Sequence, residues 1–218
     1  MKKYILFDLD GTLTESAPGI INSLKYALEK LGIADYDEEI LKKFIGPPLA
    51  VSFKEFFGFD ETGCLRAIDC YREYFSVKGL FENNVYDGVH ETLSSLKNSG
   101  LKLAVATSKP EVFTKRIIDK FRLTEYFDVI CGIPLDNEKM TKSEVISRTL
   151  KELGVIDKSE AVMVGDRFYD IDGAHENGIE CVGVTYGYGS ERELKEAGAD
   201  WIVHSALELT DMFKEVDR

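Results

Sequence analysis

Two aspartates, Asp8 and Asp10, stand one residue apart at the end of a short apolar run near the start of the sequence. Side chains two apart in a strand point the same way, so both carboxylates are expected to emerge together where that strand ends. Two like charges in one place are unfavourable unless a cation or a proton is shared between them. The pair therefore indicates a metal-assisted reaction.

Two further segments carry polar groups that suit phosphate chemistry. Thr107 and Ser108 follow the apolar run LKLAVA, and their hydroxyl and backbone donors can bind phosphate oxygens. Lys142 begins a helical pattern and offers a point charge to the same oxygens and to Asp8. Each has an ordinary explanation when taken alone, since Thr-Ser is also a helix cap and most single lysines are solvated.

Acidic residues follow a third apolar run, AVMV. Asp166 comes directly after Gly165, and Asp170 lies four residues further along. Because hard cations such as Mg²⁺ take oxygen ligands, Asp8, Asp10 and Asp166 can form a site for it, with Asp10 contributing its side chain or its backbone carbonyl. One carboxylate can then attack phosphorus to give an aspartyl-phosphate, and a second can exchange a proton with the leaving oxygen.

The elements that must position these residues alternate between short apolar strands and helices. Such alternation predicts a doubly wound α/β domain with a parallel sheet covered on both faces. Active sites of open α/β sheets gather at the carboxyl ends of strands, where the polar segments fall. The predicted strands are 3–9, 101–107, 128–131, 161–165, 181–185 and 200–203, and helices of this domain are expected to begin near 111, 141, 190 and 205.

The region 17–81 differs, because it shows helical spacing without strand–helix alternation. We therefore expect an α/β catalytic core of residues 1–16 and 82–218 and an inserted all-helical domain of residues 17–81. An insertion beside the aspartate pair is well placed to act as a lid, although a packing domain without motion is the alternative. The predicted helices of this insertion are about 20–31, 38–44, 50–57 and 61–76.

Together these motifs resemble the four ordered motifs of the haloacid-dehalogenase superfamily. They are Asp8-Leu9-Asp10-Gly11-Thr12-Leu13, Thr107-Ser108, Lys142, and Gly165-Asp166 with Asp170. The resemblance covers the whole chain and is strongest to the phosphoglycolate phosphatase-like branch, whose helical cap the insertion resembles. The loop Gly46-Pro47-Pro48-Leu49 looks like the substrate-facing cap loop of that branch. The resemblance implies a Rossmann-like core and a Mg²⁺-dependent phosphatase.

The resemblance also implies a role for each motif residue. The implied catalytic residues are Asp8 as nucleophile, Asp10 as general acid and base, and Lys142 as the stabilising lysine. The implied phosphate-binding residues are Gly11, which leaves room for the backbone to approach the phosphate, Thr107 and Ser108. The implied Mg²⁺ ligands are Asp8, Asp10 through its backbone carbonyl, Asp166, and Asp170 directly or through water.

Two positions depart from the family pattern. Arg167 stands where many members have a small polar residue, and it reaches either substrate or solvent. Lys142 lacks the proline that often follows this lysine, and Lys139 is a nearby alternative for its role. The helix start at Thr141 favours Lys142.

Two other functions remain open on the sequence. A sugar phosphomutase of the β-phosphoglucomutase type shares the aspartate pair and a helical cap, but it has Glu-Asp where this chain has Gly165-Asp166. A non-enzymatic phosphoacceptor such as a receiver domain also uses acidic residues, a hydroxyl and a lysine on a parallel sheet, but it is much shorter. A dehalogenase is disfavoured, because its reaction needs no proton donor at Asp10.

The composition limits the classes of partner that we expect for this protein. The 218 residues carry a net charge of −12 and show no basic patch, which argues against nucleic acid. The four cysteines are scattered, as expected for free thiols in a reducing cytoplasm, and no apolar run approaches a signal-peptide core or a membrane span. We expect a cytoplasmic protein, monomeric or homodimeric, acting on a small phosphorylated metabolite.

Overall fold

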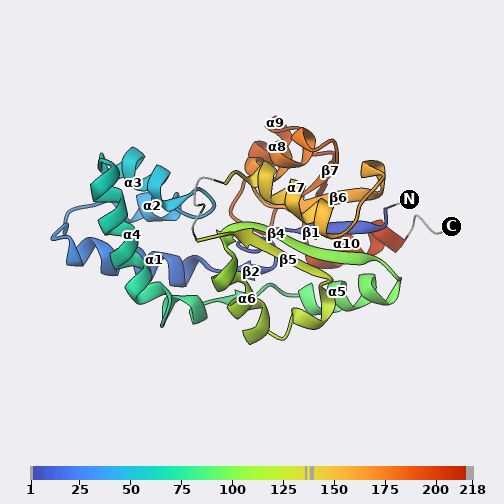
Figure 1. Ribbon diagram of the computed structural model, residues 1–218, viewed down its shortest axis with the longest axis horizontal. Helices are drawn as coiled ribbons and strands as arrows, with labels where there is room; N and C mark the ends of the chain where they lie inside the picture. Colours follow the sequence, from blue (N-terminus) through green and yellow to red (C-terminus); the bar gives the residue numbers. More distant parts are fainter. Residues whose placement is uncertain (1, 136, 138–139, 215–218) are drawn as a thin grey trace. The chain divides into compact units, whose positions relative to one another are not determined.

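The computed structural model describes residues 2–135, 137 and 140–214. The chain forms two compact units, which we call the core unit (Met1–Thr14 with Val85–Arg218) and the helical unit (Glu15–Asn84). The limits expected from the sequence, 17 and 81, lie within the bounds of the helical unit. Two short strands at the chain crossings, β2 (Thr14–Glu15) and β3 (Asn84–Val85), pair as a two-stranded sheet (Figure 1).

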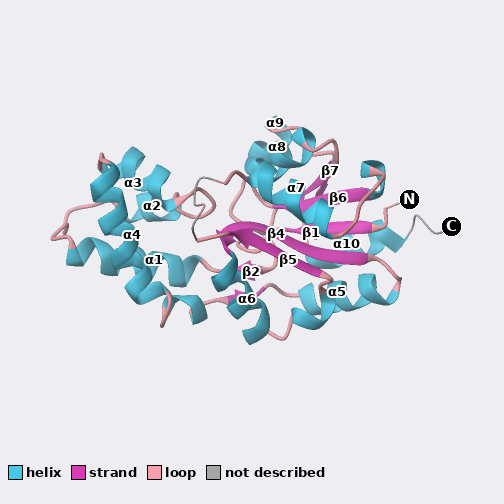
Figure 2. Ribbon diagram, in the orientation of Figure 1, coloured by secondary structure: helices cyan, strands magenta, loops and turns pink. Residues whose placement is uncertain are grey.

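A six-stranded parallel sheet in the order β5-β4-β1-β6-β7-β8 forms the centre of the core unit (Figures 1 and 2). Its strands are β1 (Tyr4–Phe7), β4 (Lys102–Pro110), β5 (Val129–Ile133), β6 (Ala161–Gly165), β7 (Glu180–Val184) and β8 (Trp201–Val203). All six predicted strands are present, with β4 extending three residues beyond its predicted end. The doubly wound α/β class predicted from the sequence is confirmed.

Helices cover both faces of this sheet, which explains why its strands read as continuous apolar runs. Ile5, Leu6 and Phe7 are all buried although they alternate between the faces. Leu6 belongs to a cluster with Ile146 and other apolar side chains of the packed helices. The helices are α5 (Val89–Asn98), α6 (Glu111–Lys120), α7 (Lys142–Glu152), α8 (Phe168–Glu176), α9 (Glu191–Glu196) and α10 (Ala206–Lys214).

The chain changes direction across the sheet beside β1. From β1 it passes to β4 and then β5 on one side, and only afterwards to β6, β7 and β8 on the other. The carboxyl ends of β1, β4 and β6 therefore lie at a switch point, which is where open α/β sheets place their ligands. Asp8 and Asp166 directly follow β1 and β6, and Thr107 follows Ala106, where the regular register of β4 against β5 ends.

The helical unit is built from α1 (Ala17–Lys30), α2 (Glu38–Lys42), α3 (Leu49–Phe57) and α4 (Glu61–Phe75). Phenylalanine rings form much of its core, with Phe44 and Phe53 fully buried and their ring centroids 5.0 Å apart. Pro48 precedes the first turn of α3, so the predicted substrate-facing loop runs directly into a helix whose Phe53 serves the unit's own packing. Among the described residues, no helix is both long and apolar enough to cross a membrane.

Candidate active site

The backbone after β1 places Asp8 at the end of the sheet and then turns sharply. The Asp8 N–H donates to the Val164 carbonyl of β6 at 2.9 Å, which extends the ladder one residue beyond β1. Gly11 follows with a φ of +87°, a conformation that favours glycine. A Cβ at Gly11 would lie 2.2 Å from Asp166 Oδ2. In this structure the bare glycine therefore makes room for the Asp166 carboxylate, whereas the sequence suggested only room for a phosphate.

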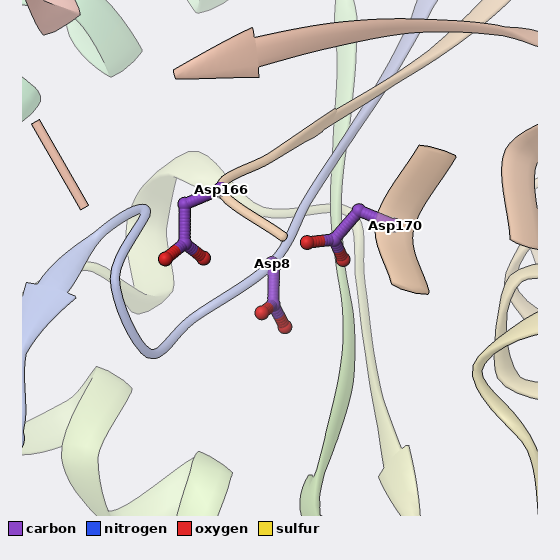
Figure 3. A group of neighbouring side chains, drawn as sticks. All are labelled: Asp8, Asp166 and Asp170. Carbon is purple, nitrogen blue, oxygen red and sulfur yellow. The ribbon is translucent and has the colours of Figure 1, made fainter. Parts of the chain in front are cut away.

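Three carboxylates and one ammonium form a compact group at the switch point. Asp8, Asp166 and Asp170 each offer a carboxylate oxygen, and these oxygens lie within 4.8 Å of one another (Figure 3). Lys142 Nζ lies 2.7 Å from Asp8 Oδ1 and 2.7 Å from Asp170 Oδ1. Its side chain is only 6% exposed, so it is a buried lysine and not a solvated one. The group leaves more negative than positive charge in a place from which water is largely excluded.

Burial and mutual repulsion set the pKa values in this carboxylate group. Burial raises the pKa of Asp166 well above its usual range, and the charges of Asp170 and Asp8 raise it further. Burial also raises the pKa of Asp170 to about 6, although the Lys142 ammonium opposes this shift. For Lys142 burial would lower the pKa, but the carboxylates of Asp170 and Asp8 outweigh it and the pKa is raised. The Lys142 ammonium therefore stays charged. Its single positive charge does not balance the three carboxylates when all of them are ionised.

The Asp166 carboxylate is held by a loop after β7 that the sequence motifs do not include. The Tyr188 N–H donates to Asp166 Oδ2 at 2.7 Å. A Cβ at Gly187 would lie 2.5 Å from Asp166 Cβ, and one at Gly189 would lie 1.9 Å from its carbonyl oxygen. Two bare glycines thus allow this loop to close over Asp166. The repeated Gly in Tyr186-Gly187-Tyr188-Gly189 is the signal that could have pointed to it.

Asp170 is fixed by the start of α8. It is the third residue of that helix, and its Oδ2 accepts a hydrogen bond from the Arg167 N–H at 3.1 Å, so it also caps the helix. A Cβ at Gly165 would lie 2.2 Å from Asp170 Cγ, so this glycine leaves room for the carboxylate. The Arg167 side chain donates from Nε to Glu193 Oε1 at 2.8 Å. Arg167 is therefore engaged with a neighbouring helix of the core unit.

The Asp10 carboxylate stands apart from the carboxylate group. Its Oδ2 lies 2.7 Å from Lys109 Nζ, and the two side chains are 14% and 5% exposed. The strand alternation that predicted two carboxylates emerging together does not apply, because β1 ends at Phe7 and the chain is already turning at Asp10. Lys109 is a site residue that the sequence reasoning missed.

The remaining predicted positions are also in place around the switch point. Thr107 is buried in β4, and its Oγ1 accepts a hydrogen bond from the Lys109 N–H at 3.3 Å. Ser108 is half-buried between them. The predicted capping box at the start of α7 is present, with Thr141 and Glu144 bonded to each other's backbone, and it fixes the first turn that carries Lys142. Lys139, the alternative to Lys142, lies outside the described residues.

The donor set of the carboxylate group fits Mg²⁺. Hard divalent cations prefer oxygen ligands, and Asp8, Asp166 and Asp170 bring three carboxylates together with a single ammonium between them. A divalent cation would relieve the excess charge that otherwise raises the pKa values of Asp166 and Asp170. The Asp10 side chain is not part of this set, and its backbone carbonyl remains the atom to be considered for the metal.

Comparison with known proteins places these residues in a family context. The family model described as "Haloacid dehalogenase-like hydrolase" matches residues 5–184. The crystal structure of a predicted phosphatase from Clostridium acetobutylicum is 52% identical in sequence, with a TM-score of 0.93 over 99% of both chains. The match spans both units and all four motifs.

Curated relatives act in phosphate chemistry by name but differ in substrate. A 5'-nucleotidase of Pseudomonas aeruginosa is 46% identical over 191 residues, which cover 88% of this chain and 86% of the relative. Tyrosine-protein kinase PtkA of Mycobacterium tuberculosis is 36% identical, covering 93% of this chain and 68% of the relative. A phosphoglycolate phosphatase of Colwellia psychrerythraea is 29% identical over 95% of both.

Proposed function

The chain belongs to the haloacid dehalogenase-like hydrolases and is a phosphatase of that family, and on this basis we propose that it hydrolyses small phosphate monoesters with Mg²⁺ through an aspartyl-phosphate on Asp8. The observation that carries the proposal is the position of Asp8, with its carboxylate beside Lys142 and in the group that fits Mg²⁺. Nucleoside monophosphates are the first substrates to test, because the relative with 46% identity is named a 5'-nucleotidase. Phosphoglycolate and sugar phosphates follow.

The first step transfers the phosphoryl group to the protein. A carboxylate oxygen of Asp8 attacks phosphorus, and the bond between phosphorus and the ester oxygen breaks. The Asp10 carboxyl, which enters this step protonated, gives its proton to the leaving oxygen and is left as the ionised partner of Lys109. Lys142 orients Asp8 and offers positive charge to the phosphate oxygens. Mg²⁺, when bound, supplies charge that offsets the phosphate and the surrounding carboxylates.

The second step returns the protein to its starting state. Water attacks the phosphorus of the aspartyl-phosphate, Asp10 takes a proton from that water, and the Asp8 carboxylate leaves. The products are inorganic phosphate and the free alcohol. Asp10 therefore gives a proton in one step and recovers one in the next, so a full turnover leaves its protonation unchanged.

Release of inorganic phosphate from a panel of monoesters tests this proposal. Asp8→Asn is expected to lower the rate with Mg²⁺ by about 10⁴-fold or more, as loss of a nucleophile does in other enzymes. Asp172→Asn, which removes an exposed carboxylate of α8, is the matched control and should keep the wild-type rate. Steady phosphate release by Asp8→Asn at the parent's rate would refute the assigned nucleophile. Conversion of one sugar phosphate into another without free phosphate would favour the mutase.

A further inference from the structure

Lys109 lies outside the motifs that suggested the function, yet its charge is buried at the site. Its Nζ lies 2.7 Å from Asp10 Oδ2, and its side chain is 5% exposed. A buried ammonium is costly unless it is paired, so a lysine in such a place is a built feature and not a surface side chain that happens to point inward. Because Asp10 carries the proton transfer of the proposed function, the pair bears directly on the reaction.

The fold holds the Lys109 backbone in one place. The register of β4 against β5 shifts between Ala106 and Pro110, as in a β-bulge, and bulges redirect side chains next to active sites. The Lys109 carbonyl packs against Gly132 of β5, where a Cβ would lie 2.5 Å from that oxygen. Its N–H donates to Thr107 Oγ1 at 3.3 Å. The direction of the Lys109 side chain therefore follows from the irregular end of β4.

The two carboxylate oxygens of Asp10 have different surroundings. Oδ2 faces the Lys109 ammonium, whereas Oδ1 is buried and, among the residues that the structure describes, has no hydrogen-bond partner. A buried carboxylate oxygen without a partner is costly, and such an atom at an active site calls for a ligand that completes it. The oxygen of a leaving group or an attacking water would do so.

We propose that Lys109 is a positioning residue, which holds Asp10 by Oδ2 so that Oδ1 is the oxygen that exchanges the proton. The proposal rests on the function proposed above and adds to it the residue that orients the general acid. The proposal also gives the two buried lysines, Lys109 and Lys142, different roles. Lys142 serves Asp8 and the phosphate, whereas Lys109 acts only through Asp10.

The test exploits the fact that esters differ in their need for a proton. The p-nitrophenolate group leaves without protonation, whereas an alkoxide such as that of glycerol phosphate needs the proton of Asp10. The parameter to compare is kcat/KM, which covers the steps through departure of the leaving group. Lys109→Met is expected to lower kcat/KM for glycerol phosphate by about 10- to 100-fold, part of the full effect of a general acid, and for p-nitrophenyl phosphate by less than about threefold.

Two controls keep a structural defect apart from the proposed role. Lys115→Met removes an exposed lysine of α6 that pairs with Glu111, and it should lower neither value of kcat/KM. In an Asp10→Asn background the Lys109→Met change should have no further effect on glycerol phosphate, because a residue that acts only through Asp10 has nothing left to orient. This double variant carries no unpaired buried charge, so it remains testable if Lys109→Met alone fails to fold.

The possible results distinguish the positioning role of Lys109 from its alternatives. Equal losses on the two esters, or a further tenfold loss when Lys109→Met is added to Asp10→Asn, would overturn the positioning role and assign Lys109 to the phosphate or to the fold. Activity of Asp8→Asn would overturn the proposed function instead. The two failures are therefore distinguishable.

Discussion

Lys142 and Lys109 are both buried ammonium groups of the core unit, but their surroundings differ in charge. Lys142 lies 2.7 Å from carboxylate oxygens of both Asp8 and Asp170, and Asp166 belongs to the same group. Lys109 lies 2.7 Å from the carboxylate of Asp10. The group around Lys142 has more carboxylates than ammonium groups, whereas Lys109 and Asp10 form a pair of one ammonium and one carboxylate.

This difference in charge matches the two roles proposed for Asp8 and Asp10, which stand one residue apart in the sequence. The centre around Lys142 fits the proposed Mg²⁺, because its carboxylates outnumber its ammonium groups. The pair of Lys109 and Asp10 adds no net charge once Asp10 has given its proton to the leaving oxygen, and the Asp10 carboxylate lies outside the group that fits Mg²⁺. Asp8 and Asp10, neighbours in one short motif, thus have different surroundings, made by residues from Lys109 to Asp170 much further along the chain.

Removing the ammonium of the unbalanced centre should have the largest effect. Lys142→Met leaves three neighbouring carboxylates, of which those of Asp166 and Asp170 are buried, without an ammonium between them. We therefore expect the free energy of unfolding without metal to fall by about 3–5 kcal/mol. Urea unfolding in the presence of a chelator measures this loss. Addition of Mg²⁺ should restore part of it, since the cation replaces the lost charge. An unchanged free energy of unfolding would show that the carboxylates do not depend on Lys142.

The two aspartates on either side of the comparison should respond differently to Mg²⁺. A cation at a hundredfold excess over its Kd stabilises the folded state by about 2.7 kcal/mol, and chelation removes this gain. We expect Asp166→Asn to lose the Mg²⁺-induced rise in Tm, and Asp10→Asn to keep it because its side chain lies outside the carboxylate group. If both variants lose the rise equally, the separation between the two centres fails.

The smallest effect is expected at Arg167, which directly follows Asp166 in the sequence but pairs with Glu193. Arg167→Gln should lower the free energy of unfolding by no more than about 1 kcal/mol, as is usual for a partly exposed ion pair. Its KM for phosphate monoesters should stay within about twofold of the wild-type value. A tenfold rise in KM would instead make Arg167 a substrate-binding residue.

Much of the fold was readable because buried parallel strands and amphipathic helices have distinct periods. The strand from Ala161 to Gly165 begins and ends where predicted, and the cap at Thr141 forms as its sequence suggests. Asp8, Lys142 and Asp166 were singled out from their places at the ends of these elements, and the structure brings them together. Local patterns suffice where a residue's position depends on its own strand or helix.

Lys109 and Tyr188 could not be found in this way. Lys109 reaches Asp10 because β4 is irregular at its end, and the alternation of a regular strand does not predict where a bulge directs a side chain. Tyr188 contributes a backbone N–H to Asp166, a contact that is independent of its side-chain type. Both contacts join segments that lie at or after the ends of different strands of the sheet, so the atoms that they bring together are known only from the assembled fold.

The central claim is that Asp8 receives the phosphoryl group while Asp10 handles the proton. Borohydride reduction of an aspartyl-phosphate converts that residue to homoserine, which peptide mass spectrometry locates. In protein quenched during turnover of a phosphate monoester with Mg²⁺, we predict homoserine at position 8. Homoserine at position 10, or no reduced residue in the peptide that carries both aspartates, would contradict the account.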